Sequence, residues 1–303
     1  QLSGLTDCDG VACAASSLTF IRGLAPSAGD IIINEIMADG SDGEQTASPA
    51  VDFIEVFNQT NHLIELTRLK INNGFFQEQV LLQPDSFLII TDTDSDPAQF
   101  FAYPNVVYME GFPLLTEDGT TIHLIVDNDT LETIQYSKAY YNDPSKEDGG
   151  WSMERVNPED PCNSYDNWKA CVRAQGSTAG KRNSVLDRTA DSSPPQLLFV
   201  LAEPANGMTL VFNEPLETPG PNVLQWTVNG IPTDATSATV TGTEHDELVI
   251  LYGTMSPQSV YSFTLQGATD CWGNVASAIS GSFALPQSPA AGDLIINEVL
   301  YNP

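Results

Sequence analysis

Basic residues are scarce in this chain. Its 303 residues include 11 Lys and Arg against 40 Asp and Glu, which gives a formal net charge of −29 at pH 7. Binding to nucleic acid or to an anionic membrane depends on clustered Lys and Arg side chains. The composition therefore argues against both kinds of partner. The acidic composition is compatible with cation binding and with staying soluble in a salty medium.

Long apolar runs and catalytic motifs are also missing. No run approaches the roughly 20 residues of a membrane span, so we expect no membrane insertion in this segment. There is no Gly-x-Ser-x-Gly elbow, His-Glu-x-x-His motif or P-loop. The three histidines are scattered, and His123 lies among apolar residues of an expected strand, as a core or sheet-face histidine would. We therefore predict that residues 1–303 are not an enzyme.

The five cysteines are unevenly spaced. Cys8 lies near Cys13, and Cys162 lies near Cys171, without the Cys-x-x-Cys spacing of a zinc site. We predict disulfides Cys8–Cys13 and Cys162–Cys171, which fit an oxidising compartment; free or metal-binding thiols are the alternative. Cys271 is then left over, either as a buried small hydrophobe or as the partner of a residue beyond Pro303.

The chain also lacks sustained helical periodicity. Short apolar segments alternate with turn residues such as Asn72-Asn73-Gly74 and Glu117-Asp118-Gly119. Further along, Met208, Leu210 and Phe212 repeat with a period of two, and Ser259–Leu265 alternates in the same way. Many short strands with turn signals predict an all-β sandwich or barrel.

An internal repeat organises the chain. Ala28-Gly29-Asp30-Ile31-Ile32-Ile33-Asn34-Glu35-Ile36-Met37 returns as Ala291-Gly292-Asp293-Leu294-Ile295-Ile296-Asn297-Glu298-Val299-Leu300. Each copy reads as a Gly-Asp turn followed by a buried strand. We predict an N-terminal leader (1–27), a first domain (28–187), a linker (188–196), a second domain (197–286), and a linker with the first strand of another copy of the first domain (287–303).

The repeated strand, together with Asp52-Phe53-Ile54-Glu55-Val56-Phe57-Asn58, resembles the opening of a lamin-tail domain, an Ig-like module. The segments 151–155 (Trp-Ser-Met-Glu-Arg) and 176–185 (Gly-Ser-Thr-Ala-Gly-Lys-Arg-Asn-Ser-Val) resemble the closing pattern of the bacterial, Bacteroidota-type branch. The segments 204–216 and 270–274 resemble a bacterial Ig-like spacer domain. Together the two resemblances imply an all-β fold with two Ig-like β-sandwich domains in tandem. The resemblance to lamin-tail domains implies an accessory module of surface proteins or of some extracellular nucleases and phosphatases.

One acidic loop is the best candidate for a site. Asp92, Asp94 and Asp96 alternate after an expected strand, and alternating carboxylates can gather oxygen ligands for Ca²⁺. The loop lacks the glycine and the distal glutamate of a complete EF-hand loop, so a solvated acidic turn is the alternative. Asp30 and Glu35 recur in both copies of the repeat. We interpret them as fold geometry, with Asp in the turn and Glu satisfying backbone donors.

We therefore expect a non-enzymatic structural or adhesive module of a large secreted or cell-surface bacterial protein. Gln1 is consistent with removal of a signal peptide before it. We expect a protein or glycan partner at the cell surface, no nucleic acid, and no cofactor besides the Ca²⁺ suggested for the acidic loop. Two alternatives stay open: an accessory region of a nuclease or phosphatase whose catalytic domain follows residue 303, and a subunit of an outer-membrane assembly.

Overall fold

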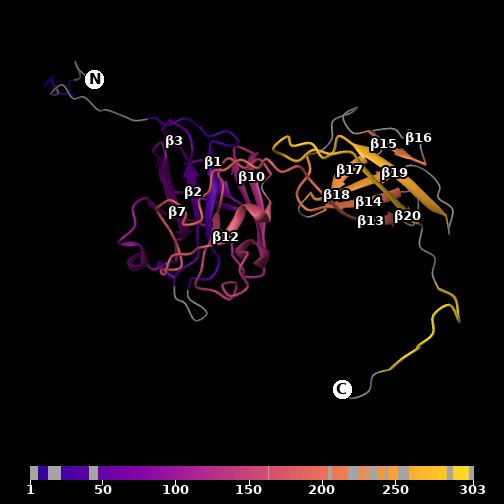
Figure 1. The fold of residues 1–303 in the computed structure, drawn as a ribbon. Helices are drawn as coiled ribbons and strands as arrows, with labels where there is room; N and C mark the ends of the chain where they lie inside the picture. The colour runs from indigo at the N-terminus through magenta and orange to yellow at the C-terminus, as the bar shows by residue number, and fades with distance from the viewer. Residues whose placement is uncertain are drawn as a thin grey trace. The chain divides into compact units, whose positions relative to one another are not determined.

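The computed structural model divides the chain into two units (Figure 1). The first comprises Gln1–Pro158 and Trp168–Asp187, and the second comprises Glu159–Asn167 and Arg188–Pro303. The structure describes residues 6–12, 22–40, 47–162, 164–203, 207–217, 225–229, 231–232, 238–242, 245–251, 259–284 and 289–299. The change of unit after Asp187 falls at the predicted end of the first domain, whereas the assignment of 159–167 to the second unit was not predicted.

A six-stranded sheet forms the centre of the first unit. Its order is β12-β11-β1-β2-β7-β8, with all pairs antiparallel except β7–β8. The strands are β1 (Ile31–Met37), β2 (Phe53–Asn58), β7 (Ser86–Asp92), β8 (Val106–Met109), β11 (Met153–Arg155) and β12 (Trp168–Ala170). Every residue of β1 and β2 is buried, so the repeated apolar run predicted from the sequence is a central strand of this sheet.

A second sheet and a short strand pair complete the first unit. The sheet has the order β10-β9-β4-β5, and β3 pairs with β6. The strands are β3 (Ile64–Glu65), β4 (Leu69–Ile71), β5 (Gly74–Phe75), β6 (Leu81–Leu82), β9 (Thr120–Val126) and β10 (Asp129–Tyr136), and the short 3₁₀ helices are η1 (Pro97–Phe100) and η2 (Lys138–Tyr141). In β9, Ile122, Leu124 and Val126 are buried, whereas the residues between them are half-buried. Burying each such side chain stabilises the folded state by about 1.5–3 kcal/mol relative to leaving it exposed to water.

Turn residues adopt the backbone conformations that the sequence predicts. Asn72, between β4 and β5, has φ of 54°, a conformation that Asn tolerates better than most residues. Gly119, just before β9, has φ of 123°. A Cβ atom at Gly119 would lie 2.2 Å from the carbonyl oxygen of Tyr136, so no other residue fits this turn.

The second unit contains two four-stranded antiparallel sheets. Their orders are β13-β14-β18-β17 and β16-β15-β19-β20. The strands are β13 (Leu197–Glu203), β14 (Gly207–Phe212), β15 (Gln225–Val228), β16 (Ile231–Pro232), β17 (Ala238–Thr241), β18 (Glu247–Leu251), β19 (Val260–Gln266) and β20 (Ile279–Ala284), and η3 is Tyr165–Asn167. Met208, Leu210, Phe212, Phe263 and Leu265 share one core, which confirms the alternation predicted for both segments. The chain is all-β, as predicted.

The cysteine pairing differs from the prediction. Cys162 forms a disulfide with Cys271, with a Cα–Cα distance of 5.3 Å, and Cys171 is a buried free thiol. The predicted Cys162–Cys171 bridge is therefore wrong. The prediction paired cysteines that are close in sequence, but Cys162 belongs to the second unit and Cys171 to the first. Cys8 is exposed, and Cys13 lies outside the described residues, so the Cys8–Cys13 bridge stays a prediction.

Peptide mapping without reduction should find a Cys162–Cys271 linked pair. Cys171 should resist iodoacetamide in the folded protein and react once the protein is unfolded, because its thiol is buried. The protein unfolded without reductant is the control, since it exposes Cys171 and leaves the disulfide intact. A linked Cys162–Cys171 peptide, or rapid alkylation of Cys171 in the folded protein, would contradict this assignment.

The second copy of the repeat forms no strand within residues 289–299. Leu294, Ile295, Ile296 and Val299 are 73–85% exposed. In β1 the same pattern is buried because β2 and β11 pair with its two edges. The repeated segment has no such neighbours among the described residues, and a lone strand cannot satisfy its backbone groups.

Candidate functional site: a buried carboxylate network

Three glutamates lie side by side in the central sheet of the first unit. Glu35 on β1 stands opposite Glu154 on β11 and opposite Glu55 on β2. All three residues are 0% exposed. Neighbouring carboxylates of this kind can carry acid–base chemistry, or they can bind the protein's own donors. Their hydrogen-bond partners decide between these roles.

Glu35 accepts hydrogen bonds from two segments near the end of the first unit. Its Oε1 atom accepts from Ser152 Oγ at 2.6 Å and from the backbone N–H of Thr178 at 2.8 Å. Its Oε2 atom lies 3.1 Å from Thr178 Oγ1. The backbone donor confirms part of the sequence interpretation, in which Glu35 serves fold geometry. Asp30 likewise accepts from the backbone N–H of Ser27 in the turn before β1.

Glu55 and Glu154 hold the same closing segment. Glu55 accepts from the backbone N–H of Gly180 at 2.5 Å and from Asn34 Nδ2 at 2.8 Å. Glu154 accepts from the backbone N–H and the hydroxyl of Ser184, at 2.6 and 2.8 Å. It also accepts from Thr178 Oγ1 at 2.8 Å and from the backbone N–H of Val185. The three carboxylates therefore anchor residues 178–185 to the sheet.

A β-bulge in β1 lies beside the glutamates. The register with β2 shifts between Ile33 and Glu35, which removes backbone groups from the ladder. The Ile33 N–H donates to Glu132 Oε2, and the Ile33 carbonyl accepts from Arg155 Nε, both at 2.7 Å. The Asn34 carbonyl accepts from Asn183 Nδ2 at 2.9 Å. Side chains thus replace the missing ladder bonds.

Arg155 is the buried cation of this region. Only 2% of its side chain is exposed, and its guanidinium forms an ion pair with Glu132 at 2.5 Å. The guanidinium carbon also lies 4.9 Å from the centre of the Trp168 ring. Because Glu132 belongs to β10, the ion pair links the two sheets of the first unit. The roles of Arg155, Glu132 and Asn183 were not predicted from the sequence. In the sequence, Arg155 and Asn183 stand out only because they belong to the closing segments 151–155 and 176–185.

Burial changes the acidity of the network. Burial, together with the neighbouring Glu154, raises the pKa of Glu35 from 4.5 to about 8, against the lowering effect of the hydrogen bonds from Ser152 and Thr178. Burial also raises the pKa of Glu55 well above its usual range, with a contribution from Glu35. A general acid must reach its substrate, and these side chains have no exposed surface. The network therefore serves the fold.

The predicted calcium loop uses its carboxylates locally. Asp92 Oδ1 accepts from the backbone N–H of Asp94 at 2.7 Å. Asp96 Oδ1 accepts from the N–H of Ala98 at 2.9 Å and caps η1. The side chain of Asp94 is exposed. The three carboxylates do not form a close group that could hold a metal ion. Calcium binding by this loop stays a prediction.

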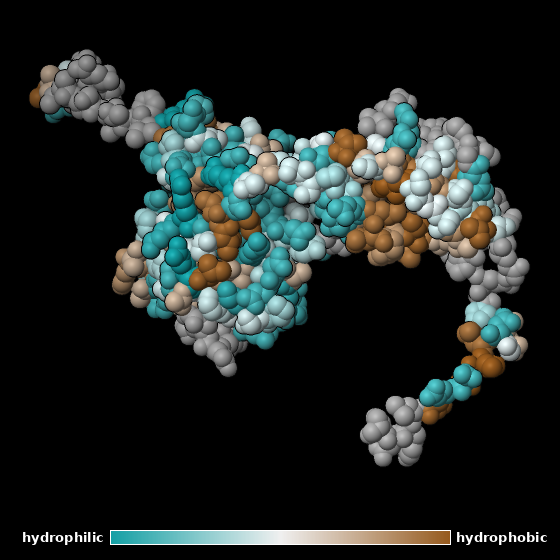
Figure 2. Space-filling view, in the orientation of Figure 1, coloured by the Kyte–Doolittle hydropathy of each residue, from teal (hydrophilic) through white to brown (hydrophobic). Residues whose placement is uncertain are grey.

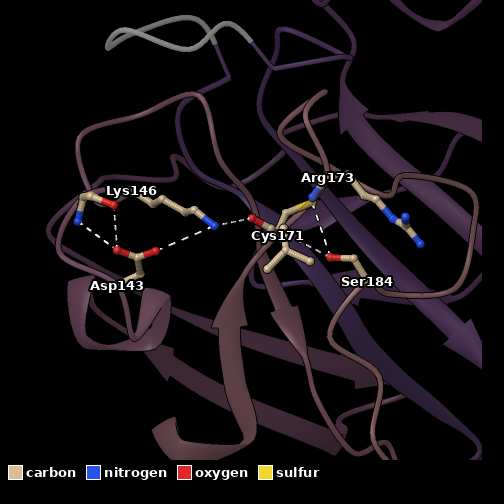
Figure 3. Close-up of polar contacts among 7 residues, drawn as sticks. Asp143, Lys146, Cys171, Arg173 and Ser184 are labelled. Atoms are coloured by element: carbon tan, nitrogen blue, oxygen red, sulfur yellow. Dashed lines mark hydrogen bonds and ion pairs between the residues drawn. The ribbon is translucent and has the colours of Figure 1, made fainter.

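The thiol of Cys171 lies beside Ser184 (Figure 3), whose hydroxyl also donates to Glu154. Its sulfur accepts from the backbone N–H of Arg173 at 3.3 Å and from Ser184 Oγ at 3.7 Å, while its carbonyl accepts from Lys146 Nζ at 2.8 Å. Burial, aided by the nearby Glu154, raises the pKa of this thiol to about 12. A thiol that stays protonated is a poor nucleophile.

The other residues singled out in the sequence are also structural. His123 Nδ1 lies 2.9 Å from Thr133 Oγ1 across the β9–β10 pair. In the adjacent aromatics Phe75-Phe76 and Tyr140-Tyr141, Phe76 and both tyrosines are buried, and Phe75 is 46% exposed.

A protein-family model matches part of the region that holds this network. Residues 25–138 match the Lamin Tail Domain model. The match runs from the approach to β1 through β10, and it includes Glu35, Glu55 and Glu132. No curated protein matches the chain.

The first unit extends beyond the matched residues. β11, β12 and the segment 176–185 lie after residue 138, yet they supply Glu154, Arg155 and Thr178 to the network. The first unit is therefore closed by residues that follow the matched range. Within the described residues, no helix is long and apolar enough to cross a membrane.

Proposed function

We propose that residues 1–303 form a non-enzymatic structural or adhesive part of a large secreted or cell-surface multidomain protein of a Bacteroidota-type bacterium. One observation carries the proposal. The polar residues of the recurring lamin-tail motif are buried and bonded to the protein's own backbone, as Glu35 is to Thr178 and Glu55 is to Gly180. Their hydrogen-bonding groups are occupied in holding the sheets and the closing segment together.

A protein partner is the second part of the proposal. The edge strand β13 exposes Leu198, Phe199 and Leu201 by 50–60%, and Figure 2 shows apolar surface on this side of the second unit. Hydrophilic residues cover most of the visible face of the lamin-tail unit in the same view. Apolar side chains along a sheet edge suit contact with another protein better than contact with a glycan.

Purified residues 1–303 should hydrolyse neither nucleic acid nor phosphoesters in the presence of Mg²⁺, Mn²⁺ or Zn²⁺. The readout is product formation over a long incubation, with a known metal-dependent nuclease as the positive control. Turnover that survives purification and disappears in a single Asp or Glu variant would overturn the non-enzymatic assignment.

Protease shaving of intact source cells tests the proposed location. We expect the protein to be cleaved while cytoplasmic markers stay intact. Lysed cells provide the control for protease activity. Protection on intact cells, with cleavage only after lysis, would contradict a cell-surface position.

A further inference from the structure

Three acidic side chains meet in the second unit, outside the lamin-tail network. Asp191 precedes β13, Glu214 follows β14, and Asp270 follows β19. One carboxylate oxygen from each residue lies within 4.8 Å of the others. The three segments are far apart in sequence, so the fold itself brings them together.

One oxygen of this cluster has no partner. The Glu214 side chain is half-buried, but its Oε1 atom is inaccessible to solvent and forms no hydrogen bond. Burying an unpaired carboxylate oxygen is costly, and native proteins rarely leave one without a donor or a cation. This atom is evidence for a missing ligand that is independent of the number of acids nearby.

Basic side chains do not balance the cluster within the described part of the chain. Asp270 is 0% exposed, and its carboxylate accepts from the backbone N–H and the side-chain amide of Asn274, both at 2.8 Å. Asp191 accepts from the backbone N–H of Ser193. Among the ion pairs between described residues, none includes any of the three acids. A positive charge at this position would relieve their mutual repulsion.

The loop that carries Asp270 is held firmly. The backbone N–H of Asp270 donates to the Asn274 carbonyl at 3.1 Å, and the N–H of Gly273 donates to the Asp270 carbonyl. Cys271, the next residue, forms the disulfide with Cys162. The Asn274 side chain also donates to the carbonyl of Asp191 at 3.1 Å. The carboxylates are thus positioned before any ligand arrives, which lowers the cost of binding.

We propose that Asp191, Glu214 and Asp270 bind a divalent cation, with Ca²⁺ as the preferred ion. The donors are all carboxylate oxygens, which suit hard cations. Ca²⁺ takes six to eight oxygens, which three carboxylates and water can supply, and it tolerates ligands from separate loops better than Mg²⁺ does. The ion would tie the segment before β13 to β14 and to the turn after β19.

The affinity should fall in the range of extracellular calcium modules, about 10⁻⁴–10⁻³ M. Titration of ¹⁵N-labelled, metal-free residues 1–303 with CaCl₂ should shift the Asn274 backbone and side-chain amide signals in a saturable way, at constant ionic strength. Mg²⁺ should require a higher concentration. Glu214→Gln keeps the shape of the side chain and should weaken binding at least about tenfold.

Glu217→Gln is the matched control, because it removes the same charge three residues away from an exposed position. In this variant, CaCl₂ should shift the Asn274 signals as it does in the unmodified protein. Asp94→Ala in the acidic loop of the first unit should also leave the Asn274 shifts unchanged. In metal-free buffer, Glu214→Gln should raise the Tm of the second unit, since one of three repelling charges is gone.

Two results would overturn the site. One is the absence of saturable Asn274 shifts up to about 10 mM Ca²⁺, well above the expected range. The other is an unchanged titration in the Glu214→Gln variant. If that variant fails to fold, Asp191→Asn makes the same test from a different segment.

Discussion

Replacing Arg155 with methionine is expected to lower the free energy of unfolding of the first unit by about 3–5 kcal/mol. The change leaves the Glu132 carboxylate, whose side chain is only 11% exposed, without its ion-pair partner. It also removes the donor to the Ile33 carbonyl at the β1 bulge and the contact with the Trp168 ring. Methionine retains much of the side-chain volume, so the loss reports the charge and its hydrogen bonds rather than a cavity.

Urea denaturation of residues 1–303 measures this effect. Arg68→Met is the matched control, because Arg68 pairs with Asp127 in the same unit while both side chains are more than half exposed. That pair should contribute about 0–1 kcal/mol. The double variant Arg155→Met with Glu132→Gln should recover part of the loss, since it removes the unpaired buried charge. Equal effects of the Arg155 and Arg68 substitutions would contradict the role assigned to Arg155.

The sequence was sufficient to predict the architecture. Period-two alternation around Phe212 and Phe263 predicts half-buried strands, and turn residues such as Asn72 mark their ends. These signals are local, because a strand buries alternate residues whatever its partner is.

The network could be predicted only in part. Glu35, Glu55 and Glu154 all lie in segments that resemble the lamin-tail family, and the structure shows that these segments meet. The sequence did not reveal that Glu35 would bind Thr178, because 143 residues separate them. The disulfide error has the same cause. Cys162 and Cys271 are 109 residues apart, and only the fold brings them together.

The hydroxyl of Thr178 indicates which state of Glu35 the network favours. A threonine hydroxyl has a single hydrogen to donate. Thr178 Oγ1 lies 2.8 Å from Glu154 Oε1 and 3.1 Å from Glu35 Oε2. If the hydroxyl donates to the nearer oxygen of Glu154, then the contact with Glu35 is a hydrogen bond only when Glu35 carries a proton. Burial acts in the same direction, since it raises the pKa of Glu35 to about 8.

The free energy of unfolding of the first unit should therefore fall as pH rises from about 5 to about 8. Folding raises the pKa of Glu35 from its ordinary value of 4.5 to about 8, so between these values the folded state binds more protons than the unfolded state. Below pH 4.5 Glu35 is protonated in both states, and its contribution is fully present. The shift corresponds to a loss on the order of 4 kcal/mol across the window. Glu55, whose pKa is also raised, adds to the same trend.

Glu35→Gln should make this pH dependence shallower and should make the unit more stable than the unmodified protein at pH 8. The glutamine amide oxygen can accept from Ser152 and Thr178, and its NH₂ group can donate to Thr178 Oγ1, so it resembles the protonated acid. Urea denaturation at pH 5, 6, 7 and 8 measures both effects. Glu78→Gln is the control, because it removes an exposed charge from the same unit and should leave the slope unchanged. A Glu35→Gln variant with the original slope, or one less stable than the unmodified protein at pH 8, would show that Glu35 is held as a charged carboxylate whose donors outweigh its burial.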